Sequence, residues 1–370
     1  MACEYAEDFA CTLSRMPVSD VVRTRIRPTI QPAKGIAAAA LSSLLLLAGC
    51  GQQDNASSIV RTTTNIAGAA VMGIDRDTTH ACALPSAPDP ATGPTRTITH
   101  LAGSSEVPAD PQRIVALTTA ALDAACALGL WERVVGAVTG DGPLPQPQYL
   151  GYGLRKVPGV GAIAQPDPAK IAELRPDLII GDIPTTTAGS DRLGTIAPTV
   201  LVGKPESWQA EFTAIAAAMG RRDAATAALD AYRTEAAQIG TAITSTQTQA
   251  SIIRFGADSL QVQGDDTFAA QVFADSGAQR PTAQRRPSFD VRSGDFDLIE
   301  GDLIYILFAG EAGKKHGEQV MRTDEWKNLG AALDRRTFIM DDSVWHGRGL
   351  TAARALLTDI RNTLNGFVTD

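Results

Sequence analysis

Histidine and aromatic residues are scarce in this chain of 370 residues. There are only four histidines, His80, His100, His316 and His346, and no two of them have the spacing of a metal-ligand pair, so no multi-histidine zinc or manganese site is predicted. The chain also lacks a Gly-x-Ser-x-Gly elbow and a Walker sequence, which argues against a secreted hydrolase or a nucleotidase. We therefore expect a protein that is not an enzyme. With aromatic residues at 5%, its alanine-rich helices must pack through small aliphatic side chains.

Positive charge is in deficit. The formal net charge is -8, with 33 Lys and Arg against 41 Asp and Glu. An acidic surface gains nothing from meeting a polyanion, so nucleic acid and anionic membrane surfaces are unfavourable partners.

The N-terminal segment is typical of export. A basic stretch with Arg23, Arg25 and Arg27 precedes an apolar run at positions 36–48, whose length of about 13 residues suits a signal-peptide core and is too short for a membrane span. The run ends in Leu-Ala-Gly-Cys at Cys50, which resembles a bacterial lipobox. We expect residues 1–49 to be a signal peptide and Cys50 to carry lipid, the sole membrane attachment, on the extracytoplasmic face (periplasm or cell-wall space). The alternative is a chance cysteine after the signal peptide.

Two cysteines remain in the globular part, Cys82 and Cys126. An even pair in an oxidising compartment predicts a disulfide, with two buried free thiols as the alternative.

Composition and periodicity divide the rest of the chain. Residues 50–95, rich in Ser, Thr and Pro, predict a tether or a loosely packed strand segment. Residues 96–221 and 246–370 alternate short apolar strands with helices, which favours parallel sheets covered on both faces. Between them, residues 222–245 predict one long helix without proline. The predicted fold is α/β: two Rossmann-like lobes joined by a single long helix.

Three phrases carry a resemblance to a known family: Pro-Gln-Arg-Ile-Val-Ala-Leu at 111–117, Leu-Gly-Leu-Trp-Glu-Arg-Val-Val-Gly at 128–136, and Leu-Arg-Pro-Asp-Leu-Ile at 174–179. Together they resemble the periplasmic binding proteins for ferric siderophores, haem and cobalamin, and the cysteine pair and alanine-rich helices are most similar to actinobacterial FecB-type lipoproteins.

The resemblance implies a class III periplasmic binding protein. It implies a monomer that holds a ferric siderophore between its lobes, with no cofactor, and delivers it to an ABC permease and its ATPase. Haem or cobalamin in the same cleft is the nearest alternative. Relatives often carry a permease-docking Glu where this chain has Ala169, so Asp167 and Glu173 are the substitute candidates. The missing Glu also motivates the alternative of a non-transport envelope protein that acts through protein contacts.

Candidate ligand residues follow strand ends, because ligands of open α/β sheets bind at the carboxyl ends of the strands. A bound iron chelate calls for guanidinium groups and aromatic faces. The arginine candidates are Arg254, Arg285, Arg286, Arg292 and Arg348. The other candidates are Trp345 and Phe308 for stacking, Tyr149 and Tyr152 on an overhanging loop, Thr119 on the first-lobe rim, and His346 as an axial haem ligand or a polar loop residue.

Overall fold

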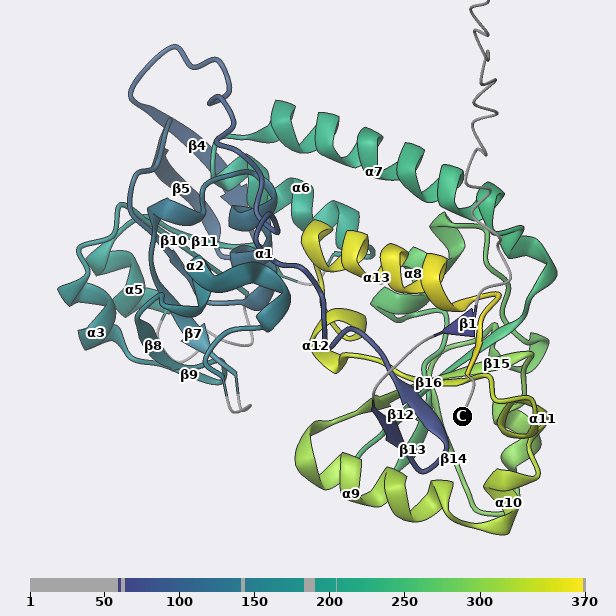
Figure 1. Cartoon of the computed structure of the whole chain (residues 1–370). Coiled ribbons are helices and arrows are strands. Elements are labelled where there is room, and N and C mark those ends of the chain that lie inside the picture. Colours follow the sequence, from purple (N-terminus) through teal and green to yellow (C-terminus); the bar gives the residue numbers. More distant parts are fainter. Residues whose placement is uncertain (1–58, 61–63, 141–143, 183–189, 204, 369–370) are drawn as a thin grey trace, which may run out of the picture. The chain divides into compact units, whose positions relative to one another are not determined.

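Two open β-sheets with helices packed against them organise the protein (Figure 1). The structure is a computed structural model, and it describes residues 59–60, 64–140, 144–182, 190–203 and 205–368. The predicted fold class is confirmed: each lobe is an α/β unit whose central strands are parallel. The signal segment and Cys50 lie outside the described residues.

The N-terminal lobe contains a six-stranded sheet in the order β11-β10-β6-β7-β8-β9, parallel except for its last pair. Its strands are β6 (Ile114–Ala116), β7 (Val134–Thr139), β8 (Gly159–Ala162), β9 (Gln165–Pro166), β10 (Leu178–Gly181) and β11 (Thr199–Leu201). A separate antiparallel hairpin, β4 (Thr95–His100) and β5 (Gly103–Pro108), packs beside β11. The sequence gives no expectation for this hairpin.

The C-terminal lobe contains a seven-stranded mixed sheet in the order β14-β13-β12-β15-β16-β3-β2. Its later strands are β12 (Ala250–Phe255), β13 (Leu260–Val262), β14 (Phe289–Val291), β15 (Leu303–Phe308) and β16 (Thr337–Ile339). Strands β12 and β13 pair in antiparallel fashion as a hairpin.

Part of the segment 50–95, for which a tether or a loosely packed strand segment was expected, belongs to this second sheet. Strand β3 (Ala69–Val71) pairs in parallel with β16, and β2 (Asn65–Ile66) pairs with β3. Farther upstream, β1 (Ile59–Val60) pairs with β17 (Phe367–Val368) near the other end of the chain. The physical reason is burial: Ala69 and Ala70 are fully buried in β3, which lies between β16 and the edge strand β2.

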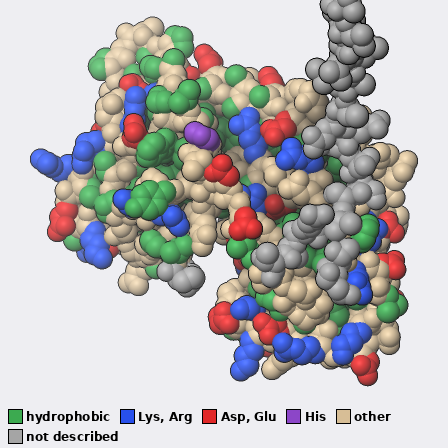
Figure 2. Space-filling view, in the orientation of Figure 1, with side chains coloured by type: hydrophobic (Ala, Val, Ile, Leu, Met, Phe, Trp, Pro, Cys, Tyr) green, Lys and Arg blue, Asp and Glu red, His purple; other side chains and the backbone are tan. Residues whose placement is uncertain are grey.

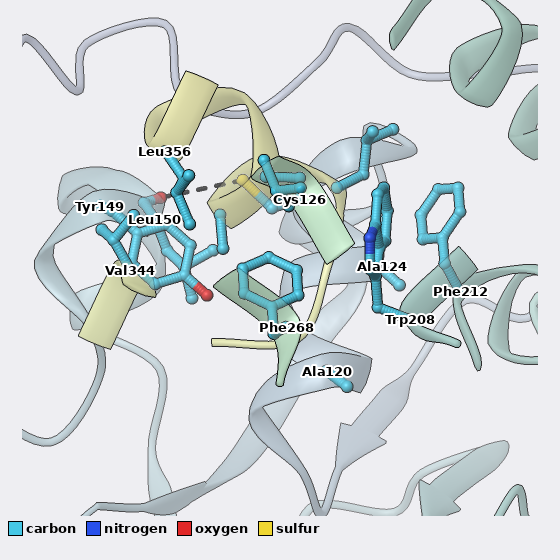
Figure 3. Packing of buried hydrophobic residues seen from close by; sticks show 14 of the residues in the cluster. Ala120, Ala124, Cys126, Tyr149, Leu150, Trp208, Phe212, Phe268, Val344 and Leu356 are labelled. Atoms are coloured by element: carbon cyan, nitrogen blue, oxygen red, sulfur yellow. Dashed lines mark hydrogen bonds between the residues drawn. The ribbon is translucent and has the colours of Figure 1, made fainter. Parts of the chain in front are cut away.

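Strand alternation divides the cores. In β6, Ile114 and Ala116 face a core that also takes residues from the second lobe, whereas Val115 faces a smaller core under the outer helices. The shared core joins α1, near Cys126, to α13, near Leu356 (Figure 3). One continuous apolar interior therefore connects the lobes.

The helices cover the sheets and link them. They are α1 (Thr119–Ala127), α2 (Gly151–Arg155), α3 (Pro168–Glu173), α5 (Ser190–Ile196), α6 (Trp208–Ala218), α7 (Arg222–Ala242), α8 (Phe268–Asp275), α9 (Gly310–Met321), α10 (Asp324–Lys327), α11 (Gly330–Leu333), α12 (Asp342–Trp345) and α13 (Leu350–Thr363). The long helix predicted at 222–245 is α7. It packs on α6 in the first lobe and on α8 and α13 in the second.

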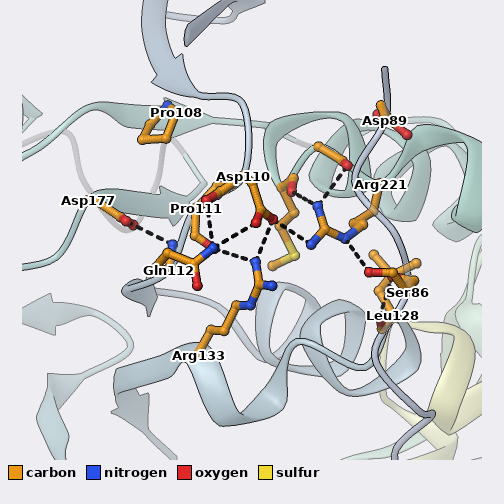
Figure 4. Close-up of polar contacts among 12 residues, drawn as sticks. Ser86, Asp89, Pro108, Asp110, Pro111, Gln112, Leu128, Arg133, Asp177 and Arg221 are labelled. Carbon is orange, nitrogen blue, oxygen red and sulfur yellow. Dashed lines mark hydrogen bonds and ion pairs between the residues drawn. The ribbon is translucent and has the colours of Figure 1, made fainter. Parts of the chain in front are cut away.

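Two cross-links brace the first lobe. Cys82 and Cys126 form a disulfide that attaches the segment between β3 and β4 to α1. The fully buried Arg221, just before α7, donates from Nη2 to Asp110 Oδ1 at 2.6 Å, and the same oxygen accepts from Arg133 Nη1 at 2.5 Å (Figure 4). Asp110 lies just before β6, Arg133 directly precedes β7, and Arg221 directly precedes α7. The network therefore fixes the start of α7 on the first lobe.

Candidate functional site

A cavity of about 480 Å³ is lined by residues of both lobes. This volume lies within the usual range of small-molecule sites, about 300–1,000 Å³. Its walls come from the ends of strands and from two loops. The lining residues are Val71, Met72, Gly73, Ile74, Thr119, Gly140, Leu144, Pro145, Gln146, Pro147, Gln148, Met340, Asp341 and Ser343.

The first-lobe wall follows two parallel strands. After β6 the chain turns at Thr118, whose side chain accepts from Ala121 N at 3.1 Å, so α1 begins with Thr119 at the cavity. After β7, Gly140 and the segment Pro145–Gln148 form the loop side. The buried Gln146 side chain donates to Val138 O at 2.8 Å, which ties this proline-rich loop back to the strand.

The second-lobe wall follows β16. Asp341 comes two residues after that strand and caps α12: its Oδ1 accepts from Ser343 N at 2.9 Å and from Ser343 Oγ at 2.7 Å. Beside it, Met72 N donates to Ile339 O at 2.9 Å and continues the β3 pairing past the strand end. The segment 71–74 therefore forms a wall of the cavity as well as an edge of the sheet.

A buried carboxylate connects the lobes behind the cavity. Asp123 of α1 accepts from Thr351 N at 2.9 Å and from Ala352 N at 3.0 Å, so the first lobe caps the N-terminus of α13 in the second. Gly349, which precedes α13, has no room for a Cβ, since that atom would lie 2.3 Å from the Asp123 carboxyl group. Burial raises the pKa of Asp123 to about 6, against the opposing effect of these hydrogen bonds.

A second polar contact crosses between the lobes at the surface. Arg348 Nε donates to Glu211 Oε2 at 2.6 Å, where Glu211 belongs to α6. The Arg348 side chain is 45% exposed and that of Glu211 is 9% exposed, so solvent screens this pair from the Arg348 side only.

Comparison with known proteins identifies the family. The Periplasmic binding protein family matches residues 114–344, which is more than half of the chain. The chain belongs to this family. Among curated relatives, the probable siderophore-binding lipoprotein YfiY of Bacillus subtilis is 30% identical over 283 residues, covering 72% of this chain and 86% of the relative. The Fe(3+)-citrate-binding protein YfmC of the same organism is 24% identical and covers 70% and 82%.

A solved relative has the same architecture. Staphylococcus aureus SirA, in its complex with staphyloferrin B, superposes with a TM-score of 0.64 at 25% identity, covering 73% of this chain and 99% of that one. The predicted resemblance to iron-siderophore binding proteins is thereby confirmed, as is the class III periplasmic binding fold. The family consists of substrate-binding proteins.

Of the predicted ligand residues, Thr119 lines the cavity. Trp345, predicted to stack on the ligand, is instead buried in the core. Trp345 is only 1% exposed, its Nε1 donates to Asp359 Oδ2 at 2.9 Å, and its ring lies 4.5 Å from that of Tyr305. The prediction placed Trp345 at a strand end, but the short helix α12 turns the side chain back into the core. It is not available to stack on a ligand.

The predicted arginines do not come together at the cavity. Arg254 forms a two-pronged pair with Asp342, with Nε to Oδ1 at 2.7 Å and Nη2 to Oδ2 at 2.9 Å. Arg285 donates to the backbone oxygen of Arg280 at 2.9 Å, and the Arg286 guanidinium lies 3.8 Å from the centre of the Phe289 ring. The exposed Arg292 and the paired Arg348 also lie outside the cavity lining. Arg254, Arg285 and Arg286 make contacts within the second lobe, whereas Arg348 pairs across the lobes.

The remaining aromatic and imidazole candidates also lie outside the lining. Tyr149 is buried, and burial beside the Asp123 carboxylate raises the pKa of its hydroxyl. Tyr152 is 63% exposed, with Lys156 Nζ 4.2 Å from the centre of its ring. Phe308 packs against Phe255, and His346 is exposed just after α12.

Sequence reasoning missed most of the cavity wall. The segments 71–74 and 145–148 contribute eight of its lining residues. The first was assigned to a tether. The second is rich in proline and glutamine, a composition that indicates a loop and gives no sign of a ligand surface.

Within the described ranges, no group of three or more His, Cys, Asp or Glu side chains is arranged to hold a metal ion. None of the helices in that same part of the chain combines the length and apolar character needed to cross a bilayer.

Proposed function

We propose that this protein captures a ferric siderophore in the cavity between its lobes and delivers it to an ABC importer, without catalysing a reaction. The observation that carries the proposal is a cavity walled by the strand ends of both lobes, in a chain of the Periplasmic binding protein family. Ligands of open α/β sheets collect at such ends. The relatives, a probable siderophore-binding lipoprotein and an Fe(3+)-citrate-binding protein, support an iron chelate as the cargo.

Calorimetric titration of the purified protein tests this capture. The panel contains ferric hydroxamate, catecholate and carboxylate siderophores, with haem and cobalamin as the alternative ligands. We expect saturable binding of at least one ferric siderophore at one site per chain. If haem or cobalamin alone binds, the cargo is wrong; if nothing binds, the transport function is wrong.

Delivery requires a surface that the permease recognises. We propose α3 for this role, with Glu173 as the main contact and Asp167 as a lesser one. Glu173 is exposed at the end of the helix, whereas the Asp167 carboxylate already caps it by accepting from Ala169 N at 3.0 Å. Glu173→Gln should reduce iron-siderophore uptake by cells while leaving chelate affinity unchanged. Unchanged uptake would remove α3 from the docking surface.

We further propose that lipid on Cys50 anchors the mature protein to the extracytoplasmic face of the membrane. Relatives described as lipoproteins support the anchor. Cys50→Ser should release the protein from the membrane fraction, and mass spectrometry of the wild-type N-terminus should detect acyl chains. Detection of an unmodified thiol at Cys50 in the mature protein would contradict the anchor.

A further inference from the structure

Among the described residues, the cavity lining combines apolar groups, amides and one carboxyl group. Apolar side chains come from Val71, Ile74 and Leu144, and Gln146 and Gln148 contribute amides. Asp341 is the one charged residue among the described residues that line it. A ligand in this cavity therefore meets a negative charge at the β16 end.

The two second-lobe arginines Arg254 and Arg348 add little positive charge to the electrostatic potential in the cavity, because both are paired. Arg254 is neutralised by two bonds to Asp342, and Arg348 by its bond to Glu211. A paired guanidinium attracts a further anion much less than an unpaired one, because its field is largely cancelled at the distance of a ligand. The formal net charge of the whole chain, -8, is also negative.

One positive contribution opposes Asp341. The N-terminus of α1 begins at Thr119 beside the cavity, and a helix N-terminus carries about half a unit of positive charge. Part of that is taken up by the Thr118 cap on Ala121 N. The full charge of Asp341 exceeds it, so the cavity is negative on balance.

We infer that the site selects neutral or cationic iron chelates over anionic ones. This inference rests on the proposed function and names the charge class of its cargo. Three hydroxamates around Fe³⁺ give a neutral complex, and a spare ammonium makes it cationic, whereas three catecholates leave three negative charges. The ferric complex of a trihydroxamate, with apolar linkers and amide groups, matches the lining of this cavity.

Calorimetry with chelates of different charge tests the inference. The probes are ferrichrome (neutral), ferrioxamine B (cationic), ferric enterobactin and ferric citrate (both anionic). One unit charge about 6 Å from Asp341 in a partly screened site should change affinity by roughly tenfold. We expect the neutral and cationic probes to bind at least about tenfold more tightly than either anionic probe.

Asp341→Asn identifies the source of this preference. Asparagine keeps the cap on α12 because its side-chain oxygen still accepts from Ser343 N, so the fold is retained. The variant should strengthen binding of the anionic probes about three- to tenfold relative to ferrichrome. Asp324→Asn is the control: it makes the same change in net charge at a side chain that is 98% exposed, and the ratios should not change.

The outcomes separate the two proposals. Tighter binding of an anionic chelate overturns the charge class and leaves siderophore capture standing. A ratio that is unchanged by Asp341→Asn overturns the role of Asp341 and with it the inference. If none of the four probes binds, and no other ferric siderophore does, the proposed function fails together with the charge class.

Discussion

The two lobes share one α/β plan but are stabilised by different means. In the first lobe, alanine-rich helices bury small side chains, and a disulfide and the Asp110 ion network add cross-links. In the second lobe, a chain of aromatic contacts joins Phe273, Tyr305 and Trp345, with no disulfide among the described residues. A core of small side chains gains less from each residue it buries, so covalent and ionic links contribute more there.

The lobes also differ in how the chain completes their sheets. The N-terminal lobe uses one continuous stretch of sequence for its six-stranded sheet. The C-terminal lobe instead takes β2 and β3 from the beginning of the described chain, and their continuation forms a wall of the cavity. Surface charges of both signs are interspersed over the face shown in Figure 2.

Removing the disulfide should have the largest effect on this comparison. The bond closes a loop with a sequence separation of 44, so Cys82→Ala with Cys126→Ala should lower the free energy of unfolding by about 4 kcal/mol. Urea unfolding followed by hydrogen exchange should show the first lobe opening before the second. Loss of both lobes together, or a loss below about 1 kcal/mol, would contradict this division of stability.

The aromatic core of the second lobe should show the next largest effect. Trp345→Phe leaves a small cavity and removes the bond from Nε1 to the buried Asp359, which should destabilise the protein by about 2–3 kcal/mol. Chelate affinity should stay within about twofold of wild type, since the ring does not line the cavity. A large loss of binding without a loss of stability would restore Trp345 to the site.

The buried carboxyl group of Asp123, which caps α13 across the lobes, predicts a pH dependence of the free energy of unfolding. Because folding raises the pKa of Asp123 from 3.8 to about 6, the folded state binds a proton more tightly, and this group adds stability as the pH falls from about 6 to 4. Asn at this position cannot titrate. The stability difference, wild type minus Asp123→Asn, should therefore grow by about 2 kcal/mol between pH 7 and pH 4.

Thermal unfolding of Asp123→Asn over this pH range measures the change, with the exposed Asp324→Asn as a control that should show none. Parallel pH profiles for wild type and Asp123→Asn would contradict the raised pKa. A difference that shrinks toward acid pH would reverse its sign and remove the buried cap from the account.

The interlobe ion pair between Arg348 and Glu211 should contribute least to the free energy of unfolding. Arg348→Gln breaks the bond to Glu211 but should cost less than about 1 kcal/mol, because solvent screens a side chain that is 45% exposed. Arg233→Gln breaks a fully surface pair with Asp230 and serves as the matched control. A loss above about 2 kcal/mol for Arg348→Gln alone would make this pair, and not the Asp123 cap, the main polar link.

Sequence periodicity predicted the elements that packing within one stretch of chain decides. The long helix begins at Arg222 as expected. The threonine cap before α1 is Thr118. For β3 the sequence left a tether and a loosely packed strand as alternatives, because Ala69 and Ala70 have no strand preference of their own and are held by pairing with β16, far along the sequence.

The candidate site was less predictable than the fold. The strand-end argument proposed Thr119, which lines the cavity, since chain direction alone fixes where a parallel strand finishes. Side-chain direction beyond the strand is set by the next turn, and for Trp345 that turn is α12, which points it into the core. The pairing of Arg254 with Asp342 depends on contacts 88 residues apart, which no local pattern reveals.

A crystal structure of the protein with a bound ferric siderophore tests the central claim most directly. The claim predicts iron density in the cavity between Thr119 of the first lobe and Asp341 of the second, with the ligand contacting segments 71–74 and 145–148. Density for the chelate on the outer face of one lobe, with this cavity holding only solvent, would contradict it.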